Sequence, residues 1–166
     1  MEKAREENRF EEILEGLREV IGREDRAGAL EVLDQTDPDD IPKLVDRLEP
    51  EERTALFGLL PPQGGAELIE RVEDFQGADI LEELPPDAAA RIISELDSDD
   101  RADLLNELDE ADSAAILEEL ETRIADETRL FMSYPEGTAG ALMYSEFVSF
   151  DADMTVDDIL ADIRSH

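Results

Sequence analysis

A repeat of twelve residues runs through the middle of this chain, from Asp37 to Leu120. Each of its seven consecutive units has apolar residues at its eighth, ninth and twelfth places, as in Leu44, Val45 and Leu48 of the first unit. Self-similarity at a constant period is typical of an array of equivalent structural units. We therefore expect this region to fold as seven copies of one small element.

The spacing within a unit predicts that this element is a helix. Apolar places at i, i+1 and i+4 form one stripe along an α-helix and conflict with the alternation of a strand. Several units begin with proline followed by acidic residues, which suits a helix N-terminus. A helix of about ten residues is marginal alone, so each must bury its stripe against the preceding and following helices. The prediction is an all-α fold, a right- or left-wound superhelical solenoid of short helices.

The flanking segments extend the helical prediction in both directions. An amphipathic helix from Phe10 to Ile21, with Gly22 at the left-handed position after its end, and a second helix from Ala27 to Leu33 are expected to cap the stack. Past the repeat the apolar pattern fails, but one more helix is expected to reach about Ser133. The helical-repeat domain is therefore predicted to span residues 1–133.

The composition changes after Ser133, where glycine, threonine and aromatic residues become frequent. We expect a tight hinge at Gly137–Gly140, a short strand at Glu146–Phe150 and a helix that begins after Thr155. One strand and one helix do not make a stable module. Residues 134–166 are therefore expected to be completed by other segments.

The charge of the chain limits its partners. Asp and Glu number 47 against 15 Lys and Arg, a formal net charge of -32. Such a surface repels nucleic acid and anionic lipid and attracts cations. A lysine-poor acidic surface is also typical of organisms with molar intracellular salt, where the Debye length is about 3 Å. The composition leaves both explanations of the acidity open.

Other features exclude whole classes of function. The chain has no cysteine and only one histidine, which is its last residue, so neither a thiolate site nor a Ser/His constellation is available. We do not expect an enzyme. Since no run of about 20 apolar residues occurs, the chain as given is not expected to cross a bilayer.

The repeat and the segment after it together resemble the cytosolic N-terminal domain of the MgtE magnesium channels and transporters. In that family a stack of short helices leads through the pattern Y-x-E-x-x-A-G-x-L-M into a pair of CBS domains and a membrane pore. The pattern is matched here by Tyr134, Glu136, Ala139, Gly140, Leu142 and Met143. The sequence FVSFDADMTVDDILADIR resembles the opening strand and helix of a CBS domain. The resemblance thus implies that residues 134–166 are a junction and the incomplete beginning of the first CBS domain.

The resemblance also implies a function. The chain would be a regulatory domain on the cytoplasmic side of the membrane that senses Mg²⁺ through acidic residues and docks on CBS domains to favour pore closure. Its partners would be the CBS domains and transmembrane pore of the same polypeptide, in a homodimer, with no nucleic acid. By position, the ligands implied for Mg²⁺ are the carboxylates of Glu67, Asp99 and Asp103 and the backbone carbonyl of Ala141.

The residues themselves allow this interpretation without requiring it. Asp99 and Asp103 lie one helical turn apart, where like charges cost a few tenths of a kcal/mol. Mg²⁺ takes only one or two carboxylates and keeps several waters, so a partner could complete a half-site. The same spacing recurs at Asp158 and Asp162, as expected for any solvated acidic face. Two alternatives remain open: a helical-repeat interaction module like those of flagellar motor-switch proteins, and an acidic surface that mimics nucleic acid and binds basic proteins.

Overall fold

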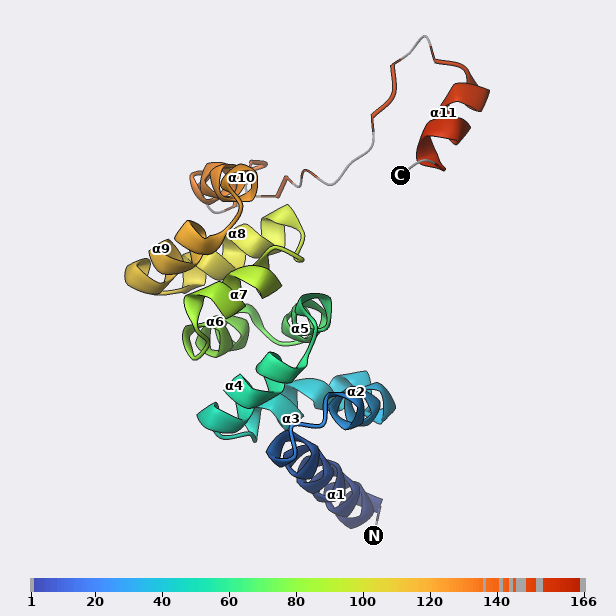
Figure 1. The fold of residues 1–166 in the computed structure, drawn as a ribbon, viewed down its shortest axis with the longest axis vertical. Helices are drawn as coiled ribbons and strands as arrows, with labels where there is room; N and C mark the ends of the chain where they lie inside the picture. Colours follow the sequence, from blue (N-terminus) through green and yellow to red (C-terminus); the bar gives the residue numbers. More distant parts are fainter. Residues whose placement is uncertain are drawn as a thin grey trace.

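The chain forms an elongated stack of short helices. The structure, a computed structural model, describes residues 2–135, 137–140, 142–143, 145, 149–151 and 154–164. Figure 1 shows the helices following one another from α1 at one end to α10 at the other, with α11 lying apart from the stack. Within the described residues every regular element is helical. The predicted all-α solenoid is confirmed.

The helices have the following bounds in chain order: α1 (Glu2–Gly22), α2 (Arg26–Gln35), the 3₁₀ turn η1 (Pro38–Asp40), α3 (Ile41–Asp46), α4 (Pro50–Leu59), α5 (Pro62–Ile69), α6 (Asp74–Glu82), α7 (Pro86–Ile93), α8 (Ser98–Glu107), α9 (Glu110–Glu119), α10 (Thr122–Met132) and α11 (Val156–Ile163).

Helix boundaries follow the repeat. From the second unit on, the residue at the first place is the N-cap and the helix begins at the second place, as in α4 after Glu49 and α8 after Asp97. The first unit differs only in dividing into η1 and α3. Apart from half-buried Val72 and Leu117, the residues at the eighth, ninth and twelfth places of all seven units are buried. The apolar stripe that the sequence predicts is therefore the core of the stack.

The order of stacking differs from the expectation that each helix packs chiefly on its immediate neighbours. The most extensive contacts within the repeat join helices two apart, such as α5 with α7 and α6 with α8. At the fifth place of their units, Gly65 and Gly77 allow this approach. A Cβ at Gly65 would lie 3.0 Å from Ile92, and one at Gly77 would lie 2.9 Å from Leu104. Each stripe is thus covered mainly by the next helix but one.

The first two helices close one end of the stack, as predicted, because α1 packs on α2 and α4. The predicted role of Gly22 is wrong: it lies within α1, and the left-handed residue is Glu24, with φ 54°. The Glu24 amide donates to the Ile21 carbonyl and the Asp25 amide to the Val20 carbonyl, the two bonds of a Schellman ending. The Asp25 side chain also caps α2 by accepting a hydrogen bond from the Gly28 amide. The left-handed residue that ends α1 therefore lies at position 24, two residues after the predicted position.

The stack continues for one helix beyond the apolar repeat. Glu121 is the N-cap of α10, so α10 begins in the register of an eighth unit. Thr128 occupies the eighth place of that unit and is fully buried. Its hydroxyl donates to the Ile124 carbonyl at 2.7 Å, which satisfies the polar group without a partner from another helix. A polar residue therefore fills a core place that the apolar pattern does not reveal.

The last described helix, α11, begins where predicted, but its apolar side chains are not buried against any described residue. Thr155 is the N-cap of α11, and its side chain and that of Asp158 form a reciprocal capping box. Val156, Leu160 and Ile163 are exposed, and no described residue of α11 is buried. Of the predicted strand, residues 146–148 lie outside the described residues and the last two residues form no strand.

Candidate functional site

Carboxylates from three elements gather at the start of α8. Asp97 is its N-cap and Asp99 and Asp100 are in its first turn, while Glu70 is the C-cap of α5 and Asp74 begins α6. We call these five residues the α8 acidic cluster. Asp100 is exposed overall; partial desolvation of its carboxyl raises its pKa, and the negative charges of the other four members raise it further. The direction of this pKa shift indicates a local excess of negative charge at the start of α8.

The structure places the predicted ligands in two groups. Asp99 is half-buried and Asp103 exposed, and they lie one turn apart on α8. Glu67 is exposed on α5, where it accepts a hydrogen bond from the Gln63 amide at 3.1 Å. It lines a cavity of about 340 Å³ together with residues of α2, yet it is only one turn before Glu70 of the cluster. Ala141 lies outside the described residues.

A second carboxylate group was not anticipated from the sequence. In the described part of the chain, three carboxylates have oxygen atoms within 4.8 Å of one another at Glu82, Asp109 and Asp112. Glu82 is the last residue of α6, and the other two lie at the N-cap and in the first turn of α9. The Asp109 amide donates to Glu82 Oε1 at 3.1 Å. Exposed groups of this kind are common on so acidic a surface, so their geometry alone assigns no function.

A spacing of 27 residues could have pointed to this group. The same separation joins Gly65 to Ile92 and Gly77 to Leu104 in the packing of helices two apart. It also separates Glu82 from Asp109. The signal has meaning only once the stacking order is known, because a nearest-neighbour stack would not bring these residues together.

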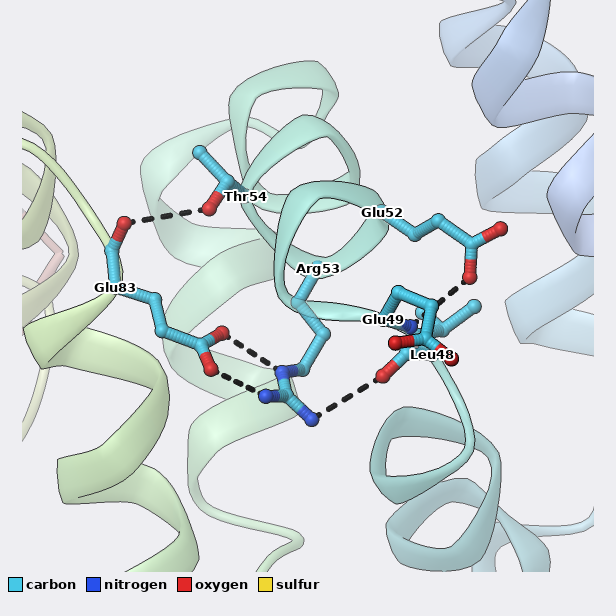
Figure 2. Close-up of polar contacts among 6 residues, drawn as sticks. All are labelled: Leu48, Glu49, Glu52, Arg53, Thr54 and Glu83. Carbon is cyan, nitrogen blue, oxygen red and sulfur yellow. Dashed lines mark hydrogen bonds and ion pairs between the residues drawn. The ribbon is translucent and has the colours of Figure 1, made fainter.

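Other charged groups hold the scaffold together. Figure 2 shows Arg53 of α4 facing Glu83, the C-cap residue of α6. Arg53 Nε donates to Glu83 Oε2 at 2.8 Å, Nη2 donates to Oε1, and Nη1 donates to the Leu48 carbonyl at 3.2 Å. Thr54 Oγ1 adds a bond to the Glu83 carbonyl at 3.2 Å. Hydrogen bonding to Glu83 raises the pKa of Arg53. This bidentate pair ties α4 to α6 and is structural.

An open groove of about 1130 Å³ lies between α1 and residues 37–47. Arg47 Nη2 lies 2.6 Å from Glu11 Oε1, and Lys43 Nζ lies 3.0 Å from Asp40 Oδ1. These lining charges are therefore already paired with one another. None of the described helices is long and apolar enough to cross a membrane.

Comparison with known proteins gives a consistent result. The family model of the MgtE intracellular N domain matches residues 36–137. The crystal structure of the soluble part of a magnesium transporter is similar, with a TM-score of 0.78 and 28% identity over 94% of this chain. The crystal structure of the cytosolic domain of the Mg²⁺ channel MgtE in complex with ATP has a TM-score of 0.77 and 32% identity over 92% of this chain. A comparison with curated protein sequences gives no match.

This chain spans less than two thirds of those structures, because the aligned region covers 62% of each. The family match, by contrast, includes well over half of this chain and contains the whole twelve-residue repeat. The chain therefore belongs to the family of the MgtE intracellular N domain.

Proposed function

We propose that this chain is the non-catalytic regulatory domain of a magnesium transporter, on the cytoplasmic side of the membrane, and that Mg²⁺ controls its docking on CBS domains of the same polypeptide. The observation that carries the proposal is the α8 acidic cluster, which brings five carboxylates from three elements to the start of α8, and where desolvation and then the neighbouring negative charges raise the pKa of Asp100. A divalent cation held there would offset the repulsion. The full-length protein would be a homodimer in which docking favours pore closure.

The mechanism is a shift between undocked and docked states. Two acidic surfaces repel one another without ions, and cations between them remove the repulsion. An ion shifts such an equilibrium only by the difference in its affinity for the two states, so Mg²⁺ must bind the docked state better. A site whose oxygen ligands come partly from each surface meets that condition, because it is complete only after docking.

Asp99 and Asp103 are the proposed ligands on α8, with Glu67 on α5 and the carbonyl of Ala141 as further ligands. Asp99 and Asp103 occupy the same helix face, and Asp99 belongs to the α8 acidic cluster. Mg²⁺ prefers hard oxygen ligands and keeps several of its waters, so one or two carboxylates from this chain suffice. The remaining ligands would come from the CBS surface.

We assign residues 134–166 to the junction and the beginning of the first CBS domain, as the resemblance implies. The support is α11, which has a capped start and an apolar stripe that nothing in the described part of the chain covers. An amphipathic helix of eight residues is not stable alone in water. The remainder of a CBS domain would provide its core.

The proposal is tested by scattering from a polypeptide that contains this chain and its CBS pair. We expect the radius of gyration to fall as Mg²⁺ rises through the millimolar range at constant ionic strength, because docking makes the molecule more compact. Dimensions that do not change with Mg²⁺ would rule out the proposed mechanism.

The ligands are tested by a double substitution, Asp99→Asn with Asp103→Asn. We expect the Mg²⁺ midpoint to rise by at least about tenfold, since loss of even an outer-sphere partner costs a metal site about 10–100-fold. The matched control is Glu118→Gln with Glu119→Gln, which removes the same charge from exposed residues of α9. An equal shift in both double variants would mean that only total charge matters.

A further inference from the structure

The second place of the repeat is used differently in one unit. In the other six units its residue is exposed: Pro38, Pro50, Pro62, Asp74, Pro86 and Glu110. In the sixth unit it is Ser98, which is fully buried. Because equivalent positions in neighbouring units stay open to solvent, packing between repeat helices does not account for this burial. A contact particular to this unit is therefore needed to explain why Ser98 is buried.

That contact comes from the segment after α10. The amide of Ser145 donates to Ser98 Oγ at 2.9 Å, although the two residues are 47 apart in sequence. Ser145 is half-buried and lines a cavity of about 390 Å³ between the turn before α8 and α10, with Asp97 and Glu127 among its other lining residues. The chain therefore returns to the start of α8 after leaving α10.

The same segment is also held where it leaves α10. Phe131 is buried in α10, and the Tyr134 ring packs edge-on against it, with centroids 6.2 Å apart. Gly140 also packs closely on the Tyr134 ring, because a Cβ at Gly140 would lie 2.6 Å from atoms of that ring. Between them, Thr138 Oγ1 donates to the Pro135 carbonyl at 2.7 Å. Gly140, the last residue of the glycine-rich stretch, is thus held against Tyr134, while Gly137 has φ 73° and open space around it.

We propose that the described residues between Tyr134 and Ser145 form a strap, fixed to the stack at Phe131 and at Ser98, which moves with the stack as one body. Movement of the stack relative to α11 then takes place beyond Ser145 and not at Gly137–Gly140. An extended chain of eleven residues could reach about 35 Å from α10, so fixing its far end to α8 strongly limits where the following segment starts.

The strap has a consequence for regulation that rests on the proposed function. Ser98 follows Asp97, a member of the α8 acidic cluster, directly in sequence. The following segment therefore leaves the stack beside the cluster. If the docking partner is attached there, the short path raises its local concentration at the proposed ion site. The strap itself requires no ion and would persist if the Mg²⁺ mechanism were disproved.

The test is amide hydrogen exchange at Ser145 in the purified chain without Mg²⁺. We expect protection in the natural sequence and about tenfold faster exchange in Ser98→Ala, the order of effect of one lost hydrogen bond. The control is Ser94→Ala, which lines the same cavity but whose hydroxyl bonds the Arg91 carbonyl of its own helix. Exchange at Ser145 that is unprotected, or that is unaltered by Ser98→Ala, would overturn the proposal.

A measurement on the unmodified chain guards against a variant that fails to fold. Backbone NMR order parameters at Thr138, Met143 and Ser145 should be close to those of α10, about 0.85, whereas values below about 0.6 would mark a flexible tether and contradict the strap. A compaction experiment that fails while these residues are rigid would disprove the Mg²⁺ mechanism and leave the strap intact.

Discussion

Helices α7 and α11 are built alike and end in opposite environments. Each has eight residues, at least one acidic residue in its first turn and an apolar stripe. In α7 the stripe is buried, with Ile93 fully inaccessible, while in α11 Val156 is 71% exposed and Ile163 is 54% exposed. The difference is that α7 contacts α5 and α9, whereas α11 lies apart from the stack. Amphipathicity is thus a property of a helix, but burial is a property of its neighbours.

The comparison predicts that the same substitution lowers the free energy of unfolding strongly in α7 and hardly at all in α11. Ile93→Ala should lower the free energy of unfolding by about 3 kcal/mol, since it removes a fully buried side chain and leaves a cavity. Ile163→Ala should change it by less than about 0.5 kcal/mol, as for other exposed positions. Urea denaturation followed by circular dichroism measures both. Similar effects would mean that α11 is packed in solution.

The connection between helices two apart can be broken at its polar contact. Arg53→Met should destabilise the stack by about 2 kcal/mol, because it leaves the largely buried Glu83 carboxylate without its bidentate partner. Arg91→Met on α7 is the control, since its pair with Asp87 is exposed and lies within one helix. Thermal unfolding should separate the two variants. If both are equally mild, the apolar contacts alone hold α4 on α6.

The smallest expected effect is the pH response, which should have opposite sign in the two regions. The pKa of Asp100 is raised when folded, so its contribution to stability is present below the unfolded pKa of about 3.9 and is lost as the pH rises through the folded value. The pKa of Asp158 in α11 is lowered by hydrogen bonds from Thr155, so its contribution is lost as the pH falls.

Carboxyl NMR titration measures both groups directly. The resonance of Asp100 should titrate above the ordinary carboxyl value and that of Asp158 below it. Substituting Asp74→Asn should move the titration of Asp100 towards its ordinary value, because one of the repelling charges is gone. No response of Asp100 to this change would show that Asp74 does not contribute to its raised pKa.

The local features of the fold could be predicted from sequence because each depends on a few adjacent residues. The N-cap at Asp97, the capping residue Thr155 and the apolar eighth and ninth places all follow from spacing along one chain segment. The prediction at Gly22 failed for the converse reason. Asp25 is the N-cap of α2, and its position decides where α1 ends. A rule based on glycine alone does not take the following helix into account.

The features of the candidate site likewise fall into those that local spacing predicts and those that depend on tertiary packing. Asp99 and Asp103 could be placed on one helix face because their spacing is a local quantity. The approach of Glu70 and Asp74 to Asp100 could not, since it depends on how α5 and α6 meet α8. The carboxylate group at Glu82 and Asp109 and the contact of Ser145 with Ser98 could not be predicted from sequence either, because they too depend on how separate segments pack.

By itself the sequence determined the repeat length, the helical starts and the side of each helix that is apolar. Only the tertiary structure decided that each helix packs mainly on the next but one, and that one serine in the repeat is covered by a later segment. The physical reason is that hydrogen bonds and caps act within a turn of the chain, whereas the hydrophobic effect is non-directional. An apolar stripe requires a cover, and the shapes of the neighbouring helices, including Gly65 and Gly77, select which one provides it.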